Sequence, residues 1–302
     1  MLGPQFELRT SNFTLLVLLL TACASQPQDV PMHATSAAPA AASAQTQCAA
    51  WAAPLNAVLW MQTSAEYQAI MRETYRTART QLDLALADPA WNALPDVTLA
   101  PSKPPAVILD LDETAIDTSA QTARQIRAHE TYSDEAWMRF SMAGNARAIA
   151  PALDFFQYAA SKSVTVFYIT NRKTEEEPPL RRNLIALGFP MSDTTDTVLT
   201  RGERPEWTGD KTSRRMFVAA NYRVVELFGD DLNDFVAAAG KSLAERNDLM
   251  RRYDEQWGRR WFALPNPVYG SWERAVVAGA SGPCGEFQKK LDTLRTDEDY
   301  KP

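Results

Sequence analysis

The hydrophobic pattern of the chain alternates between short apolar runs and longer amphipathic stretches. Runs of four to seven apolar residues, bounded by turn-forming or polar residues, are typical of strands buried in a parallel sheet. The predicted strands are residues 106–109, 164–170, 197–200, 223–228 and 261–264. Strands that alternate with helices predict right-handed crossovers and an α/β fold with a parallel, doubly wound sheet.

The longest amphipathic stretch follows Thr63-Ser64-Ala65-Glu66, which has the pattern of a capping box at the start of a helix. Apolar residues then recur at helical spacing until Asp88-Pro89 ends the pattern. The apolar face of this helix predicts that it packs on the sheet. Further helices are predicted at residues 133–142, from 150 onward, from about 175 to 188, at 210–220 and at 243–257.

The N-terminus has the features of an export signal. Arg9 precedes an apolar stretch, residues 13–20, which is too short to span a membrane and has the length of a signal-peptide core. Leu20-Thr21-Ala22-Cys23 resembles the bacterial lipobox, which implies a signal peptide over residues 1–22 and lipidation of Cys23. Acyl chains on Cys23 would anchor the protein without a spanning helix. The alternative is an ordinary secretory signal.

The residues after the lipobox set the domain organisation. Residues 23–47 are rich in Ala, Ser, Gln, Thr and Pro and show no periodicity, so we predict a flexible tether. Residues 48–302 are predicted to form the folded domain, with a helical N-terminal part at 51–100. In an oxidising compartment Cys48 and Cys284 could form a disulfide, but the sequence leaves this open.

Composition narrows the possible partners. The chain has 302 residues, 45% hydrophobic and 23% charged, which is ordinary for a globular protein with a sizeable core. The formal net charge is −6 and no basic run is present, so a nucleic-acid partner is not expected. The three cysteines are too few and too scattered for a zinc cluster.

Two carboxylates follow the first predicted strand, at Asp110 and Asp112. Residues two apart in an extended chain point the same way, and open α/β sheets bind ligands at the carboxyl ends of their strands. Two carboxylates this close repel one another unless a metal or a basic group compensates their charge. The pair therefore predicts a charged site at this edge of the sheet.

Further polar residues follow the other predicted strands or lie between them. They are Thr170, Asn171, Lys211, Asp230, Asp231 and Asp234. Each alone has an ordinary explanation as a strand end, a solvated lysine or a helix cap. Together they supply a nucleophile, a proton donor and charge stabilisation, which are what phosphoryl transfer requires. Mg²⁺ prefers such oxygen ligands and commonly shares a site with phosphate.

The order of these motifs resembles that of a known family. Asp-x-Asp-x-Thr at residues 110–114, the later Thr170 and Lys211, and Gly-Asp-x-x-x-Asp at residues 229–234 resemble the haloacid dehalogenase (HAD) superfamily. Within it, the chain is most similar to the class C acid phosphatases, the bacterial lipoprotein branch, over most of residues 50–280. The resemblance implies a Rossmann-like five-stranded sheet of order 5-4-1-2-3, flanking helices and no large cap domain.

The resemblance also assigns roles in catalysis. It implies that Asp110 is the nucleophile that forms an aspartyl-phosphate and that Asp112 is the general acid and base. Thr170 would donate a hydrogen bond to a phosphoryl oxygen, and Lys211 would neutralise the phosphoryl charge. Substrate-binding residues are expected to be Asn171, Trp137, Tyr269 and Trp272. The three aromatic side chains could stack on a nucleobase or simply pack in the core.

The resemblance implies Mg²⁺ as the cofactor. Its ligands would be Asp110, the main-chain carbonyl of Asp112 and Asp230, with Asp234 in support.

The expected function is therefore that of a Mg²⁺-dependent acid phosphatase acting on 5′-nucleotides and other small phosphate monoesters. Anchored through Cys23, it would lie in the bacterial outer membrane, facing the periplasm or the cell surface, because Ala24 and Ser25 do not resemble an inner-membrane retention signal. The rivals are a catalytically weak binding or storage lipoprotein on the same fold and a phosphotransferase. The physiological substrate, the membrane and the choice between monomer and homodimer stay open.

Overall fold

The structure is a computed structural model that describes residues 48–98 and 101–297. The predicted signal peptide, the tether and the lipidation site Cys23 lie outside the described residues, and their assignments stay predictions. Within the described part of the chain, no helix is both long enough and apolar enough to cross a membrane.

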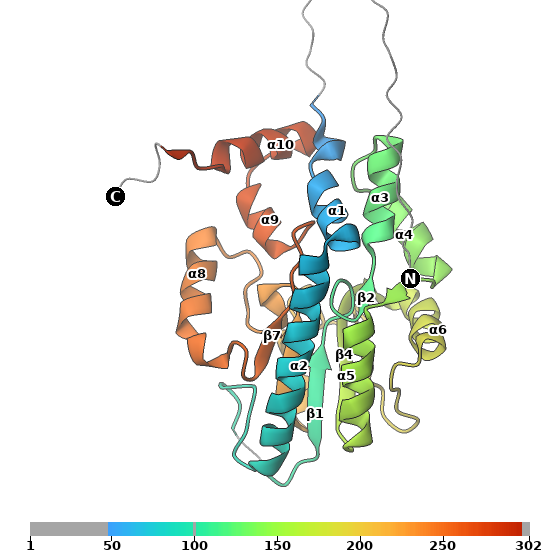
Figure 1. Ribbon diagram of the computed structural model, residues 1–302, viewed down its shortest axis with the longest axis vertical. Coiled ribbons are helices and arrows are strands. Elements are labelled where there is room, and N and C mark those ends of the chain that lie inside the picture. Colours follow the sequence, from blue (N-terminus) through green and yellow to red (C-terminus); the bar gives the residue numbers. More distant parts are fainter. Residues whose placement is uncertain (1–47, 99–100, 298–302) are drawn as a thin grey trace, which may run out of the picture. The chain divides into compact units, whose positions relative to one another are not determined.

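A five-stranded parallel sheet forms the centre of the fold, in the order β5-β4-β1-β6-β7 (Figure 1). Its strands are β1 (Pro105–Leu109), β4 (Thr165–Lys173), β5 (Val198–Arg201), β6 (Arg223–Gly229) and β7 (Trp261–Ala263). Numbered one to five along the chain, these strands have the predicted order 5-4-1-2-3. The structure therefore confirms the expected α/β sheet. A separate two-stranded sheet, β2 (Ile116–Asp117) with β3 (Arg147–Ala148), was not predicted.

The register aligns the carboxyl ends of the three central strands. Leu109 at the end of β1 pairs with Tyr168 of β4 on one side and with Phe228 of β6 on the other. The residues that follow these positions lie at one edge of the sheet, where open parallel sheets bind ligands. The predicted site residues at 110–112, 170–171 and 230–234 follow these three positions.

Helices flank the sheet and extend beyond its carboxyl edge (Figure 1). The α-helices are α1 (Leu55–Thr63), α2 (Ala65–Ala87), α3 (Ser119–Ala128), α4 (Asp134–Ala143), α5 (Ala150–Ser161), α6 (Glu177–Leu187), α7 (Thr212–Ala219), α8 (Leu243–Arg252), α9 (Ser271–Val276) and α10 (Gly282–Thr293). Short 3₁₀ turns are η1 (Ala50–Ala52), η2 (Thr174–Glu176), η3 (Leu232–Asp234) and η4 (Asp254–Gln256).

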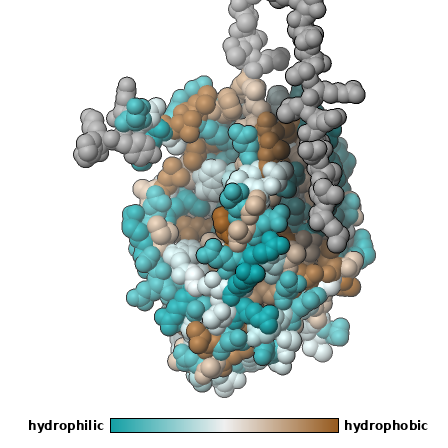
Figure 2. All heavy atoms as spheres, viewed as in Figure 1, coloured by the Kyte–Doolittle hydropathy of each residue, from teal (hydrophilic) through white to brown (hydrophobic). Residues whose placement is uncertain are grey.

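The two faces of the sheet carry separate apolar cores. Helices α2 and α5 cover one face, drawn in front in Figure 1, and bury Met71, Leu82 and Ala159 there. On the other face, α7 buries Val218 against Leu227 of β6 and other residues. The outward side of α2 is mainly hydrophilic, whereas apolar residues gather over α1 and α10 (Figure 2).

Phe228 of β6 lies at the centre of an aromatic cluster beneath α2 and α5. The ring centroids of Tyr75, Phe155, Phe156 and Phe262 lie between 4.9 and 5.7 Å from that of Phe228. Each such pair stabilises the fold by about 0.5–1.5 kcal/mol beyond the burial of its area. This packing fixes the position of the strand that leads into the acidic residues of the site.

Two predicted helix boundaries were wrong. The cap of α2 is Ser64, whose hydroxyl accepts a hydrogen bond from the Tyr67 amide at 3.0 Å. Thr63 instead ends α1, and its hydroxyl donates to the Leu59 carbonyl at 2.6 Å, so the predicted capping box does not form. The predicted helix 243–257 also ends early, because α8 stops at Arg252 and η4 follows.

Strand β4 is longer than predicted. The run 164–170 was expected to end before Asn171, but the strand continues to Lys173 and pairs with Arg201 after an irregularity in its register. The extra residues are polar, so their hydrophobicity gave no strand signal. This extension places Arg172 in a strand, with its side chain in the interior.

Candidate active site

Asp110 begins the site directly after β1. Its amide donates a hydrogen bond to the Phe228 carbonyl at 3.0 Å, so the backbone is still held by β6 at this residue. Beyond it, the chain turns, and the Leu111 carbonyl accepts hydrogen bonds from the Ala115 and Ile116 amides at 2.8 and 2.9 Å. The carboxylate of Asp110 is therefore presented by a rigid strand end and a tight loop.

Lys211 is buried at the first turn of α7 and joins two carboxylates. Its Nζ contacts Asp110 and lies 2.6 Å from Asp234. Burial lowers the pKa of Lys211, but the two carboxylates outweigh burial and hold the pKa above its usual value. Lys211 is therefore a fixed positive charge beside Asp110.

The loop after β6 carries the other acidic residues. Asp230 accepts hydrogen bonds from the Asn266 amide at 2.8 Å and from the Thr114 hydroxyl at 3.2 Å. Asp234 folds back so that its Oδ2 accepts a hydrogen bond from the Asp231 amide at 3.0 Å. A Cβ at Gly229 would lie 2.2 Å from this oxygen, so only glycine fits there.

Three carboxylates converge at this edge of the sheet. Oxygens of Asp110, Asp230 and Asp234, here called the acidic cluster, all lie within 4.8 Å of one another. Burial, with the neighbouring Asp110 and Asp234 charges, raises the pKa of Asp230 well above its usual value. Lys211 is the cation that contacts the cluster directly, while the buried Arg214 and Arg215 lie close enough to interact with the charge of Asp234. Three carboxylates that converge within 4.8 Å form an all-oxygen donor set, which suits a divalent cation.

Asp112 belongs to a different contact. Its carboxylate does not join the acidic cluster but accepts two hydrogen bonds from Arg172, at 3.1 Å from Nε to Oδ2 and 2.6 Å from Nη2 to Oδ1. Arg172 also donates to the Ser141 hydroxyl at 3.0 Å. Arg172 was not predicted as a site residue. The only feature in the sequence that pointed to it is its position immediately after Thr170 and Asn171.

The two polar residues predicted on β4 differ in exposure. Thr170 is buried and does not line the cavity; its hydroxyl accepts a hydrogen bond from the Arg172 amide at 3.1 Å. Asn171 lines the cavity, and its side chain is fixed by the Gly209 carbonyl at 3.0 Å and by Arg214 at 2.7 Å. Asn171 thus shares the cavity with the acidic cluster, whereas Thr170 is buried away from the cavity.

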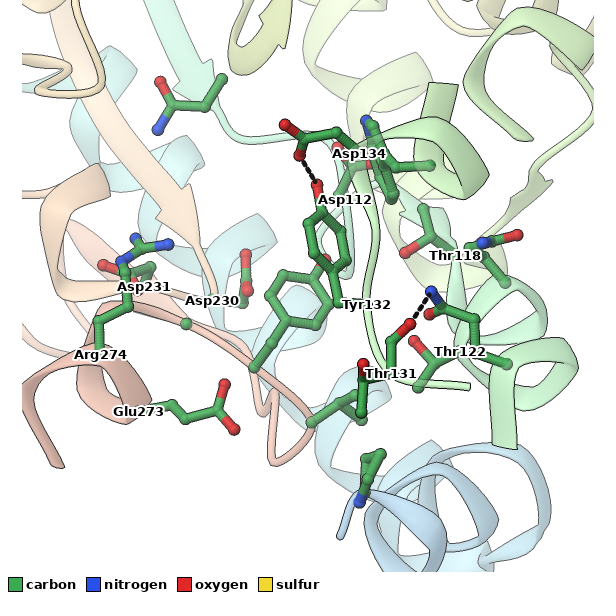
Figure 3. A pocket seen from close by; sticks show the side chains of 18 of the residues that line it. Asp112, Thr118, Thr122, Thr131, Tyr132, Asp134, Asp230, Asp231, Glu273 and Arg274 are labelled. Carbon is green, nitrogen blue, oxygen red and sulfur yellow. Dashed lines mark hydrogen bonds between the residues drawn. The ribbon is translucent and has the colours of Figure 1, made fainter. Parts of the chain in front are cut away.

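The site opens into a cavity of about 710 Å³. Figure 3 shows Thr122 and Thr131 on one side and Glu273 and Arg274 on the other, with Asp230 between them. The walls come from η1, α3, α4, α9 and α10. Residues 48–98 and 101–297 form no large cap domain over the site, which agrees with the expectation from the sequence.

Two of the three predicted aromatic residues line the cavity. Trp137 of α4 donates from Nε1 to Glu176 at 2.9 Å, and Tyr269 donates from its hydroxyl to Glu113. Trp272 is not part of the cavity lining; its side chain is exposed and its Nε1 donates to the Tyr269 carbonyl at 3.2 Å. The structure therefore brings Trp137 and Tyr269 near the acidic residues and leaves Trp272 outside.

Glu113 is a buried carboxylate that the sequence analysis did not single out. It has a positive φ of 58°, and its Oε1 accepts hydrogen bonds from the Thr118 amide at 2.9 Å and hydroxyl at 2.6 Å. Burial, together with the nearby Asp112, raises the pKa of Glu113 to about 8. With Tyr269 bound to its other oxygen, Glu113 links the loop after β1 to the loop before α9.

The outer wall is tied by a disulfide between Cys48 and Cys284, whose Cα atoms are 5.6 Å apart. It joins the residues before η1 to the first turn of α10. Helix α10 has no buried residue of its own, and a further tie runs from Lys290 to Glu273 of α9. The possibility that the sequence left open is thus realised in the structure.

Comparison with known proteins identifies the family. The family model for HAD superfamily, subfamily IIIB (Acid phosphatase) matches residues 15–272. The class C acid phosphatase from Bacillus anthracis is 31% identical, with a TM-score of 0.73, over 82% of this chain and 99% of that chain. A structure of the Bacillus anthracis enzyme with tungstate bound gives 30% identity and a TM-score of 0.72 over the same shares. The chain belongs to the HAD superfamily, subfamily IIIB of acid phosphatases, and is a phosphatase of small phosphate esters.

Proposed function

We propose that the protein is a Mg²⁺-dependent phosphomonoesterase that works through an aspartyl-phosphate on Asp110. The observation that carries the proposal is the convergence of Asp110, Lys211 and the acidic cluster at the carboxyl edge of the sheet. Lys211 stabilises the negative charge of the phosphoryl group beside the carboxylate that attacks it.

The reaction divides into two displacements at phosphorus. The Asp110 carboxylate attacks phosphorus and the ester oxygen leaves, taking a proton from Asp112. Water then attacks the phosphorus of the aspartyl-phosphate, and Asp112 accepts the proton of that water. Phosphate leaves and Asp110 is regenerated as a carboxylate. The resemblance assigns Thr170 a hydrogen bond to a phosphoryl oxygen. Its hydroxyl hydrogen is available, since the hydrogen bond from Arg172 uses only a lone pair of that hydroxyl, but the buried side chain would have to turn toward the cavity to donate it.

The acidic cluster fits a hard divalent cation. Asp110 and Asp230 would bind it, with the Asp112 carbonyl and with Asp234 in support, because carboxylate oxygens that converge this closely are the ligands such a cation prefers. When bound, Mg²⁺ supplies charge that polarises a phosphoryl oxygen and lowers the repulsion between phosphate and Asp110.

The cavity supports small phosphate esters, including 5′-nucleotides, as substrates. Trp137 and Tyr269 offer aromatic surface on its walls, which suits a nucleobase, and Asn171 offers an amide near the acidic cluster. Trp272 could contribute only if the α9 end of the cavity rearranged. Tungstate is a tetrahedral oxyanion like phosphate, and its presence in the Bacillus anthracis relative supports an oxyanion site in this fold.

The cellular setting is also part of the proposal. Residues 1–22 would be removed, Cys23 would carry the lipid, and residues 23–47 would hold the catalytic domain away from the outer membrane. Incorporation of labelled palmitate into wild type, but not into Cys23→Ser, would test the anchor. Incorporation into Cys23→Ser would contradict it.

The central experiment compares wild type with Asp110→Asn. Wild type should hydrolyse p-nitrophenyl phosphate with Mg²⁺ and lose this activity with a chelator. The variant should be inactive but keep the wild-type circular dichroism spectrum. Full activity in the variant would overturn the nucleophile assignment, and an inactive wild type would favour a binding or storage protein. Transfer of phosphate to an added nucleoside, at the expense of free phosphate, would indicate a phosphotransferase.

A further inference from the structure

Arg172 is a buried cation, and among the described residues Asp112 is the carboxylate that pairs with it. Only 3% of its side chain is exposed, and that of Asp112 is 14% exposed. A guanidinium that loses water is stable only when its charge is paired and its donors are satisfied. Asp112 satisfies the charge, and the Ser141 hydroxyl satisfies a further donor.

The geometry of the pair fixes the orientation of the Asp112 carboxylate. Nε of Arg172 contacts Oδ2 and Nη2 contacts Oδ1, so both oxygens are held by one planar group. Such a two-point contact sets the plane of the carboxylate as well as its position. Each oxygen keeps a second lone pair, and Asp112 lines the cavity, so the contact with Arg172 does not close off the carboxyl group from the cavity.

Two side chains of helix α4 contact the guanidinium group of Arg172. Ser141 accepts a hydrogen bond from its Nη1, and the Trp137 ring lies 5.2 Å from its guanidinium carbon. Ser141 and Trp137 are four residues apart on α4, so they share one face of that helix. A wall of the cavity thus supports the contact that orients Asp112.

We propose that Arg172 is the positioning residue of the proton-transfer step, holding Asp112 toward the oxygen that leaves phosphorus. This rests on the proposed role of Asp112 as general acid. Arg172 itself transfers no proton and forms no bond to phosphorus. In the first displacement the P–O ester bond breaks, Asp112 gives its proton to the leaving oxygen, and the resulting carboxylate stays bound to Arg172.

The proposal predicts a dependence on the leaving group. p-Nitrophenolate is a stable anion and leaves with little protonation, whereas an alkoxide must be protonated as it leaves. A general acid contributes about 100- to 10,000-fold where its proton is needed. If Asp112 loses its orientation, hydrolysis of alkyl phosphates should therefore become slower, whereas hydrolysis of p-nitrophenyl phosphate should change little.

The test measures kcat/KM, which reports the steps up to loss of the leaving group, for p-nitrophenyl phosphate and glycerol phosphate in wild type, Arg172→Gln and Arg172→Lys. In Arg172→Gln we expect kcat/KM to fall more than about 100-fold for glycerol phosphate and less than about 10-fold for p-nitrophenyl phosphate. Arg172→Lys keeps the buried charge without the planar fork and should give an intermediate ratio. Arg139→Gln, an exposed arginine of α4 paired with Glu135, is the matched control and should give the wild-type ratio.

The ratio of the two kcat/KM values does not depend on how much of a variant is folded, because both substrates report the same active molecules. Asp112→Asn tests the general acid separately from its positioning by Arg172. A changed ratio in Asp112→Asn with an unchanged ratio in both Arg172 variants would overturn the positioning role alone. An unchanged ratio in Asp112→Asn would overturn the general acid and the positioning role with it. An equal fall for both substrates in Arg172→Gln would overturn the proposal in favour of phosphate binding or folding.

Discussion

At the scale of single residues, the side chain of Asp234 requires glycine at position 229. Asp234 turns back toward β6 to reach Lys211 and the Asp231 amide, and the space beside Gly229 is filled by its carboxylate. A methyl group there would lie 2.2 Å from Asp234 Oδ2 and 2.4 Å from its Cβ, far inside van der Waals contact. The glycine therefore belongs to the geometry of the acidic cluster.

Gly229→Ala should weaken both activity and the response to Mg²⁺. The added methyl displaces Asp234 and with it the salt bridge to Lys211, at a cost of about 1–3 kcal/mol of stability, as for other overpacked sites. The control is Gly209→Ala, since nothing lies within 4 Å of a Cβ at that position. Titration of activity with Mg²⁺ and thermal unfolding measure the two effects. Equal behaviour of the two variants would show that Asp234 moves at no cost.

Glu226 places a carboxyl group inside β6, where no described residue bonds either of its oxygens. Burial first, and then the Asp83 charge, raise the pKa of Glu226 well above its usual value. The folded protein therefore keeps this proton at pH values where the unfolded chain loses it. Because the folded state then binds more protons, stability falls as pH rises above the unfolded pKa near 4.5.

Glu226→Gln should remove the loss of stability that wild type shows as the pH rises. Its stability relative to wild type should be nearly constant below pH 4 and grow above it by about 1.4 kcal/mol per pH unit, until wild type also ionises. Urea unfolding at several pH values between 4 and 8 measures the difference. Glu73→Gln on the exposed face of α2 is the control. A pH-independent difference for Glu226→Gln would mean that the folded carboxyl titrates normally.

At the scale of elements, α10 is the least anchored wall of the cavity. It buries no side chain, and its described ties are the disulfide to Cys48 and the Lys290–Glu273 ion pair. Pro283 and Phe287 of this helix nevertheless line the cavity. A wall held by so few contacts depends strongly on its covalent link.

Cys48→Ser combined with Cys284→Ser should loosen this wall while leaving Asp110 and Lys211 in place. We expect KM to rise several-fold with kcat nearly unchanged, and stability to fall by about 2–4 kcal/mol. Steady-state kinetics and urea unfolding test this, and reduction of wild type with dithiothreitol should reproduce it. A fall in kcat at constant KM would show that the disulfide acts on the acidic cluster instead.

Elements with strong local periodicity could be predicted from the sequence. The apolar residues of β1 and β6 and the helical pattern of α4 depend on neighbouring residues, so the pattern alone located these elements. The polar end of β4 and the two-residue strands β2 and β3 form only through pairing with distant segments, which a local pattern does not show.

The same distinction applies to the site. Asp110, Lys211 and Asp230 were predicted because each follows or precedes a recognisable element. The contact between Arg172 and Asp112 joins residues 60 apart and depends on the continuation of β4, so no spacing signalled it. Glu113 was missed for a related reason, since its burial follows from a left-handed turn and from Tyr269 far along the chain.

At the scale of the whole molecule, the proposed metal site would couple ion binding to folding. The three carboxylates of the acidic cluster repel one another in the metal-free fold, and an ion that binds only the folded state stabilises that state by mass action. Wild type should therefore unfold at a higher temperature as Mg²⁺ increases, by about 2.7 kcal/mol of stability at 100 times the dissociation constant. A chelator should lower activity and melting temperature together.

The variant Asp230→Asn distinguishes the effect of charge repulsion within the acidic cluster from the effect of metal binding. The substitution removes one negative charge from the cluster and keeps a side chain of the same size beside Asn266 and Thr114. Without metal the variant should be at least as stable as wild type, because the charge it removes is buried among like charges. Mg²⁺ should raise the stability of the variant only slightly, because the variant lacks a carboxylate that would bind the ion directly. The variant should also be nearly inactive. Calorimetry across a series of Mg²⁺ concentrations distinguishes the effect of charge repulsion from the effect of metal binding. If Asp230→Asn is less stable than wild type without metal, yet is stabilised by Mg²⁺ as much as wild type, Asp230 stabilises the fold and does not bind the ion.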